Sequence, residues 1–337
     1  MTALAPRRTK TTKPKTAKSK PVKPKTAKPA KRPRPPKPVS RSGVHMFTPL
    51  LTAILAAAGV AVIYRVFVLS ALGQDIDTQA LRNADVGHER AVQIMDRALN
   101  GTSLVSLVLV CVAIALIGIV RRRADLAVAA SIMVIGANAT SQLLKMRLER
   151  PDLDGSAMSN SFPSGHATAA ASVAFALVLV LPLAVRGMVS LIGAGYVAVI
   201  AVATVWAEWH RPSDTIAALL VVLAWGGLVT FWLRVRNRRR PGTIERANRL
   251  PTVLFVVGGG LSALITAVGL GAVVLSERVT PDLVSGRFAF LTGATAITAA
   301  VAAVFLLWVR LAAGDQPATD APVSKARSSD DFEGGNR

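Results

Sequence analysis

The chain has 337 residues, of which 52% are hydrophobic and only 18% are charged, and its mean hydropathy is +0.45. This composition is too apolar for an ordinary soluble protein, so we expect a membrane protein. A helix needs about 20 largely apolar residues to cross the hydrocarbon layer. Eight such runs occur, near 47–70, 102–120, 124–144, 166–185, 188–208, 212–233, 251–275 and 288–309. The sequence therefore predicts an all-α, polytopic membrane helical bundle.

The formal net charge of +21 is concentrated beside these runs. Residues 1–43 hold 15 Lys or Arg and no acidic residue, and seven more basic residues lie between Arg234 and Arg249. Positive charge retained in the cytoplasm explains both clusters more economically than nucleic-acid binding does. The same rule predicts a multi-pass protein of the cytoplasmic (inner) membrane with both termini in the cytoplasm.

The predicted spans divide the chain into five parts. The N-terminal part is too polar to bury a core and is expected to be disordered, either solvated or in contact with anionic headgroups. Between the first two spans, residues 71–100 carry mixed charge with some helical periodicity and are expected outside. The five parts are a basic cytoplasmic tail (1–43), a six-span core (44–235), a basic cytoplasmic loop (236–250), a C-terminal two-span hairpin (251–310) and a disordered tail (311–337).

Three polar clusters interrupt the apolar pattern, at the ends of the third, fourth and sixth spans. They read KMRLERP at 145–151, PSGH at 163–166 and HRPSD at 210–214. Because consecutive spans alternate in direction, all three clusters emerge on the outer side, at the depth of lipid headgroups. Charged groups at this depth are costly unless they are paired or used. We therefore expect the three clusters to form one outward-facing site.

The first two clusters are suited to hold a phosphate. Ser164 and Gly165 stand at the start of the fourth span, where free backbone N–H groups and a hydroxyl can hold an anion. Lys145, Arg147 and Arg150 add positive charge, and arginine can bind two phosphate oxygens at once. Snorkelling to the interface and pairing with a neighbouring glutamate would explain one or two of these cations. All three beside a glycine-serine turn favour a phosphate site.

The third cluster adds a nucleophile. His210 and Asp214 lie four residues apart, so the carboxylate can accept the proton of one ring nitrogen and leave the other free to attack. His166, from another helix end, can protonate the departing oxygen and later activate water. An isolated pair of this kind is more often a helix cap; the second histidine and the cations favour catalysis. Cys111 is the only cysteine, which excludes an intrachain disulfide and a cysteine metal site. No metal and no cofactor is predicted.

These residues resemble the type 2 phosphatidic acid phosphatase family, which shares its core with the vanadium haloperoxidases. The signature of that family is K-x6-R-P, then P-S-G-H, then S-R-x5-H-x3-D. The second element is complete at 163–166, and the third ends correctly at His210 and Asp214. The resemblance covers roughly residues 100–235. It implies a helical core and a metal-independent phosphatase with a phosphohistidine intermediate on His210.

The sequence departs from the family pattern in two places. Only four residues separate Lys145 from Arg150, and these two fit a shorter form of the first element only in part. The Ser-Arg pair of the third element falls on Ala203-Thr204, so one phosphate-binding arginine is absent. Our hypothesis is that Arg211 or Arg147 replaces it.

The predicted function is hydrolysis of a lipid phosphate or diphosphate at the outer face of the membrane. The alternative is a non-catalytic lipid-phosphate binder or transporter on the same fold, which the absent arginine permits. A soluble-type haloperoxidase fits less well, because spans occupy most of the chain. The lipid is not specified, since phosphatidate, phosphatidylglycerophosphate and isoprenyl diphosphates present similar headgroups. Nothing in the sequence indicates the oligomeric state.

Overall fold

The structure is a computed structural model that describes residues 43–82, 93, 97, 104–155, 159–237, 249–279 and 283–313. All of these residues belong to one compact unit, Pro38–Arg337. They are largely helical and include no strand, which confirms the predicted all-α class. The predicted N-terminal tail, nearly all of the C-terminal tail, most of the basic loop and most of 83–103 lie outside the described residues.

Each of the eight apolar runs corresponds to a helix. Six of the helices are long and apolar enough to cross a membrane, whereas α4 and α6 are shorter apolar helices of 17 and 16 residues. The chain is therefore a multi-pass membrane protein. The helices are α1 (Gly43–Ile63, continued by the π-helical η1, Tyr64–Val68), α4 (Leu104–Val120), α5 (Ala124–Arg147), α6 (Gly165–Val180), α7 (Leu183–Trp206), α8 (Pro212–Arg236), α9 (Arg249–Arg278) and α10 (Gly286–Ala313).

Two prolines set helix boundaries at opposite ends of the bundle: Pro182 follows α6, and Pro212 begins α8 beside the candidate site. The fourth predicted span ends at Val180, earlier than expected, because Leu181 precedes Pro182 and takes an extended conformation with φ −78° and ψ 157°. Pro212 is the first residue of α8, where its missing N–H costs no helical hydrogen bond. The chain therefore turns sharply between α6 and α7, and again between α7 and α8.

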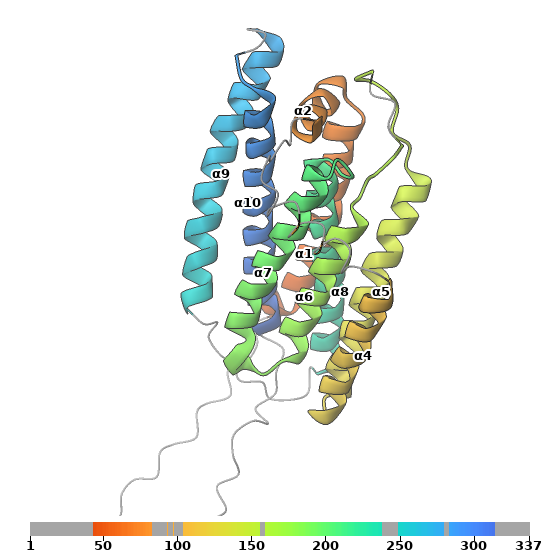
Figure 1. The fold of residues 1–337 in the computed structure, drawn as a ribbon. Helices are drawn as coiled ribbons and strands as arrows, with labels where there is room; N and C mark the ends of the chain where they lie inside the picture. Colours follow the sequence, from red (N-terminus) through yellow and green to blue (C-terminus); the bar gives the residue numbers. More distant parts are fainter. Residues whose placement is uncertain are drawn as a thin grey trace, which may run out of the picture. The chain divides into compact units, whose positions relative to one another are not determined.

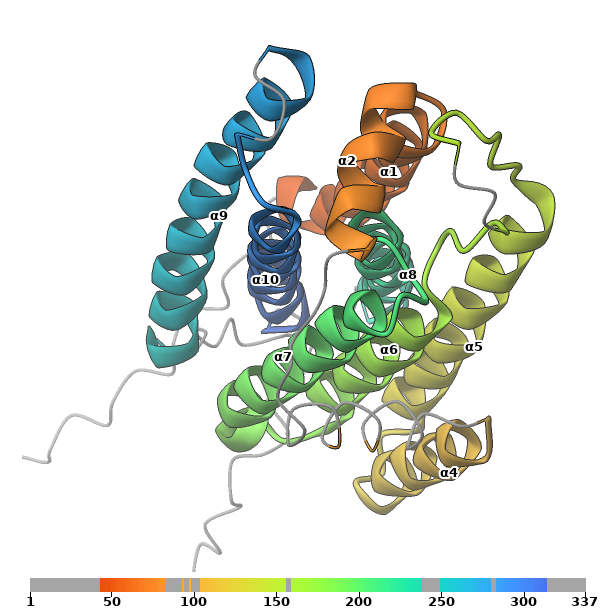
Figure 2. The ribbon, with the colours of Figure 1, turned by 45° about the horizontal axis from the view of Figure 1, so that its top comes forward.

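Helix α8 occupies the middle of the bundle. It packs against α1, α5, α6 and α10, while α4 and α9 lie at the periphery (Figure 2). In the most apolar window of α8, 61% of the residues are buried, against 17% for α9. The first turn of α8 carries Asp214, so the carboxylate of the candidate site stands on the most enclosed helix.

Helix α10 is also part of the core. Trp308 stacks on Phe175 of α6 with ring centroids 4.6 Å apart, and its indole N–H donates to the Phe175 carbonyl at 3.2 Å. Gly226 of α8 makes room for this indole, because a Cβ atom there would lie 2.9 Å from the Trp308 ring. Consequently α10, although it comes late in the chain, holds α6 and α8 together.

Buried arginine stabilises the helix ends opposite the three polar clusters. Arg186 is 5% exposed and donates from Nη2 to the Leu179 carbonyl (2.7 Å), from Nε to Leu181 (2.9 Å) and from Nη1 to Ala312 (3.0 Å). Arg234 donates to another carbonyl of α10. These carbonyls belong to helix C-termini, which lack helical partners and carry partial negative charge.

One further helix, α2 (Ala71–Arg82), lies at the end of the bundle where the polar clusters meet (Figure 1). Its buried residues include three polar side chains beside the apolar Ala80 and Leu81: Gln74, Asp77 and Thr78 are 1%, 3% and 6% exposed. Buried polar side chains are almost always hydrogen-bonded. Helix α2 is therefore expected to contact polar groups of the core.

Candidate active site

The structure brings the three polar clusters together at one end of the bundle. The Ser164 N–H, at the start of α6, donates to the Asp214 carbonyl in the first turn of α8 at 3.0 Å. Asn160 donates to the carbonyls of Lys145 and Leu148 at 3.2 and 2.7 Å, which fixes the segment before α6 to the end of α5. The convergence predicted from the alternation of spans is observed.

The two histidines lie beside each other. The ring centroids of His166 and His210 are 6.4 Å apart, with an angle of 64° between the planes. His210 is buried, and His166 is half-buried against Trp209, with 5.4 Å between the ring centroids. The N–H groups of Trp209 and His210 both donate to the Thr204 carbonyl, so the backbone at Thr204 fixes the turn that carries His210.

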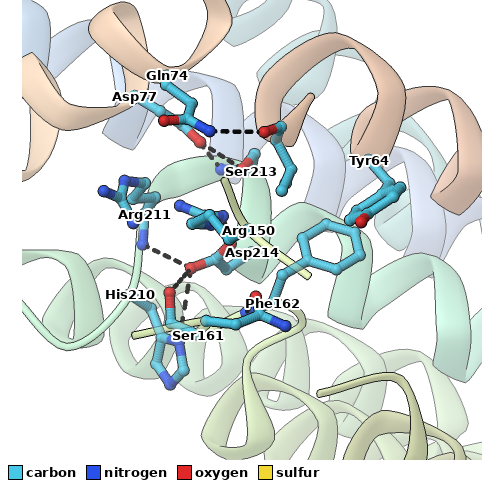
Figure 3. Close-up of polar contacts among 12 residues, drawn as sticks. Tyr64, Gln74, Asp77, Arg150, Ser161, Phe162, His210, Arg211, Ser213 and Asp214 are labelled. Carbon is cyan, nitrogen blue, oxygen red and sulfur yellow. Dashed lines mark hydrogen bonds and ion pairs between the residues drawn. The ribbon is translucent and has the colours of Figure 1, made fainter. Parts of the chain in front are cut away.

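Asp214 is the centre of the site (Figure 3). Its Oδ1 forms an ion pair with Nη2 of Arg150 at 2.8 Å. Its Oδ2 accepts from the Arg211 N–H at 3.0 Å and from the Ser161 hydroxyl, and lies 3.8 Å from Nδ1 of His210. The carboxylate therefore caps α8 and also faces His210. The distance between His210 Nδ1 and Asp214 Oδ2 is longer than a hydrogen bond, and His210 Nδ1 has no hydrogen-bond partner in the described part of the chain.

The Arg150 guanidinium has N–H groups that can still bind a ligand. Its side chain is 2% exposed, yet Nε and Nη1 have no partner among the described residues. A buried N–H without an acceptor is costly, and a guanidinium matches two oxygens of a phosphate. An anion ligand would satisfy these groups.

The remaining predicted phosphate ligands surround the histidines. Lys145 is half-buried at the end of α5, within range of charge interaction with Asp214 and His166. The Ser164 hydroxyl oxygen accepts from the Ala167 N–H at 3.3 Å and so caps α6, and Gly165 is the first residue of that helix. The start of α6 thus points at the space beside the histidines, as a phosphate cradle requires.

The two arginines proposed to replace the absent one lie in different surroundings. Arg147 is exposed in the last turn of α5. Arg211 is 1% exposed and lies among the site residues, where its Nε donates to Thr78 of α2 at 3.1 Å (Figure 3). Burial and the nearby charge of Arg150 lower the pKa of Arg211, while Asp214 opposes the shift. Of the two, Arg211 has the better position to act.

Residues of α2 are the part of the site that sequence reasoning missed. Gln74 donates to the carbonyls of Val68 and Pro151 at 2.6 and 2.7 Å and accepts from the Leu153 N–H at 3.2 Å. It thereby ties the loop after Arg150 to the end of η1. Gln74, Asp77 and Thr78 follow the i, i+3, i+4 spacing of one helix face. That polar stripe in a mixed-charge segment was the only sequence signal for this contact.

Asp77 connects α2 to the first turn of α8. Its carboxylate accepts from the Ser213 N–H at 3.2 Å and from the Ser213 hydroxyl. Burial and, to a smaller extent, the negative charge of Asp214 raise the pKa of Asp77 to about 7, against the opposing effects of the hydrogen bonds from Ser213 and the charge of Arg150. Asp77 and Ser213 also stand on the wall of an apolar cavity of about 90 Å³ between α2, α8, α9 and α10, away from the histidines.

No three His, Cys, Asp or Glu side chains in the described ranges converge as a metal site would require. The two histidines, one central carboxylate and the surrounding cations instead suit an anionic substrate.

Comparison with known proteins identifies the part of the chain that carries this site. Residues 126–240 match the family model of the PAP2 superfamily. This segment belongs to that superfamily. The PAP2 segment contains all three polar clusters, and the family predicted from the sequence motifs is confirmed. PAP2 proteins are phosphatases, so the match supports phosphoester hydrolysis. Helices α2, α9 and α10 lie outside the PAP2 segment. No curated protein and no solved structure matches the chain.

Proposed function

We propose that the protein is a metal-independent membrane phosphatase that hydrolyses a lipid phosphate or diphosphate through a phosphohistidine intermediate. The observation that carries the proposal is the pair His166 and His210, side by side at one end of the spans, with a buried carboxylate and cations around them. A phosphate that reaches this site from the membrane is attached to a lipid.

In the first step, His210 attacks phosphorus. Its Nδ1 is turned toward Asp214, so Nε2 is the nitrogen that forms the N–P bond. The P–O bond to the lipid breaks, and the His166 imidazolium donates its proton to the departing oxygen. Lys145, Arg150 and the free N–H groups at the start of α6 stabilise the negative charge that develops on the phosphoryl oxygens.

In the second step, water releases the phosphate. His166 is now neutral and takes a proton from the water molecule that attacks phosphorus. The N–P bond breaks, inorganic phosphate leaves, and both histidines return to their starting protonation states. The same His166 thus acts first as acid and then as base.

The distribution of charge supports an outward-facing site. Arg121, Arg122 and Arg123 lie between α4 and α5, at the end of α5 opposite Lys145, and Arg186 also lies away from the site. Basic residues beside spans are retained on the cytoplasmic side. In this orientation the site faces outward from the cytoplasmic membrane and both termini are cytoplasmic.

The test is phosphate release by purified protein in detergent, with a chelator present, from phosphatidate and from an isoprenyl diphosphate. The wild type is expected to release phosphate, and His210→Ala is expected to release none. His45→Ala, which removes a histidine at the start of α1, serves as the matched control.

Rapid quenching of the reaction should trap phosphate on wild-type protein but not on His210→Ala. Full activity of His210→Ala would exclude the mechanism, and substrate binding without turnover by the wild type would favour the non-catalytic alternative.

A further inference from the structure

Thr204 occupies the position at which the family signature has a phosphate-binding arginine. Its side chain is fully buried and its hydroxyl donates to the Ala201 carbonyl of its own helix at 2.8 Å. The side chain thus contributes no charge and its hydroxyl is already bonded. A cation that compensates for the absent arginine must come from another position.

Helix α2 holds the guanidinium of Arg211. Nε of Arg211 donates to the Thr78 hydroxyl oxygen at 3.1 Å, and the Thr78 hydroxyl donates to Oδ2 of Asp154 at 2.5 Å. Nη2 of Arg211 lies 3.9 Å from the same carboxylate oxygen. The Thr78 hydroxyl therefore accepts a hydrogen bond from Arg211 and donates one to Asp154 at the same time. Thr78 holds the Arg211 guanidinium at Nε, and Asp154 lies near it at Nη2.

Arg150 and Arg211 both contact Asp214: the Arg150 guanidinium pairs with Oδ1, and the Arg211 backbone N–H donates to Oδ2. Burial lowers the pKa of the Arg211 guanidinium, the positive charge of Arg150 lowers it as well, and the carboxylates of Asp214, Asp77 and Asp154 oppose the shift. Asp214 and Asp154 offset part of the repulsion between these two cations, and a bound anion would offset more of it. Arg150 also holds two N–H groups without partners in the described part of the chain. These features fit an anion bound jointly by Arg150 and Arg211.

We propose that Thr78 of α2 is a positioning residue, which holds Arg211 so that Arg211 binds the phosphoryl group in place of the arginine absent at Thr204. The identity of the anion as the substrate's phosphoryl group rests on the proposed function. Thr78 lies outside the PAP2 segment, whereas Arg211 and Thr204 both lie within it, so a residue from another part of the chain positions the compensating arginine.

The experiment is a double-mutant cycle with two readouts on full-length protein in detergent. The variants are Thr78→Val, Thr78→Ser, Arg211→Gln and the Thr78→Val/Arg211→Gln double variant. Thr230→Val is the control, because Thr230 is buried and, among the described residues, its hydroxyl bonds only to carbonyls of its own helix α8. The readouts are kcat and KM for phosphatidate, and the binding of inorganic phosphate measured by thermal stabilisation.

Thr78→Val is expected to reduce kcat/KM and phosphate affinity roughly tenfold, as for loss of one hydrogen bond to a charged group. Thr78→Ser should stay within about twofold of wild type because it keeps the hydroxyl. In the Arg211→Gln background, Thr78→Val should change neither readout further, since coupled residues are not additive. Thr230→Val should match wild type in both readouts.

The proposal is overturned if Thr78→Val behaves as wild type, if Thr78→Ser fails to restore the readouts, or if Thr78→Val is as harmful without Arg211 as with it. Phosphate binding that depends on Thr78 and Arg211 without lipid hydrolysis would leave this inference standing and refute the phosphatase. Lipid hydrolysis with readouts insensitive to Thr78 would do the reverse. Wild-type protein that neither binds phosphate nor hydrolyses lipid phosphate would refute both.

Discussion

Nη2 of Arg150 lies 2.8 Å from Oδ1 of Asp214, and the two side chains are 2% and 0% exposed. The sequence motifs assigned these residues to separate tasks, Arg150 to the phosphate and Asp214 to His210. The structure joins them in one buried ion pair next to the nucleophile. Binding of a phosphate at the free N–H groups of Arg150 would therefore act on the same carboxylate that orients His210.

The first prediction concerns this ion pair. Arg150→Met should lower the free energy of unfolding by about 3–5 kcal/mol, because it leaves the charge of Asp214 buried without its partner. It should also abolish phosphate release. Arg147→Met is the control: Arg147 is exposed in the last turn of α5, three residues before Arg150, and its loss should change stability by no more than about 0.5 kcal/mol. Denaturant unfolding in detergent measures both variants, and equal stability of the two would contradict the prediction.

A more conservative substitution separates charge from geometry at this position. Arg150→Lys keeps the positive charge but cannot bind the carboxylate and a phosphate with one planar fork. The variant should therefore fold with a smaller loss of stability than Arg150→Met, while kcat/KM falls about tenfold or more. Steady-state phosphate release beside the unfolding curve checks this. Wild-type kcat/KM in Arg150→Lys would show that the fork is not needed.

The third prediction concerns pH and Asp77. Burial raises the pKa of this carboxyl from 3.8 to about 7, so between these values the folded state binds more protons than the unfolded state. The free energy of unfolding should therefore fall as the pH rises through this window, by up to about 1.4 kcal/mol per pH unit from this group. The contribution is fully present below about pH 4 and lost above about pH 7.

Asp77→Asn should remove the pH-dependent contribution of Asp77 to the free energy of unfolding. The stability of this variant should therefore change less than that of wild type between pH 5 and pH 8. Asp75→Asn, on the same helix but less buried, should retain the wild-type pH dependence. Thermal unfolding of the three proteins at several pH values provides the measurement. Parallel curves for Asp77→Asn and wild type would show that Asp77 is not the titrating group.

The spans could be predicted from the sequence because hydropathy acts over about 20 residues and needs no partner. His166 and His210 could be predicted because they stand at helix starts within specific motifs. The role of α2 could not, because Gln74, Asp77 and Thr78 are unremarkable in a mixed-charge segment until Pro151, Ser213 and Arg211 fold against them. Hydrogen bonds between residues 77 to 136 positions apart leave no periodic signal in either segment.

The fourth prediction concerns the opposite end of the bundle. Arg186→Met should destabilise the protein by roughly 3 kcal/mol, because three charge-assisted hydrogen bonds to helix carbonyls are lost together. The folded fraction should keep wild-type kcat/KM, since these carbonyls lie away from the histidines. Arg122→Met, an exposed arginine between α4 and α5, is the control and should unfold as wild type does. A kcat/KM loss in Arg186→Met at a temperature where it is fully folded would contradict this separation.

The last prediction tests whether α10 is part of the core that supports the site. A Cβ atom on Gly226 of α8 would lie 2.9 and 3.1 Å from two atoms of the Trp308 ring, which is itself fully buried. The indole cannot retreat freely, because it stacks on Phe175 and donates to its carbonyl. Gly226→Ala should therefore destabilise the protein by about 1–3 kcal/mol through overpacking. Gly195→Ala in α7 is the matched control: in the described part of the chain, no atom lies within 4 Å of a Cβ atom placed there. Because alanine favours a helix interior more than glycine does, the control should be neutral or more stable by up to about 1 kcal/mol. Thermal unfolding in detergent compares the two, and a Gly226→Ala protein as stable as Gly195→Ala would mean that α10 does not pack against α8 at this glycine.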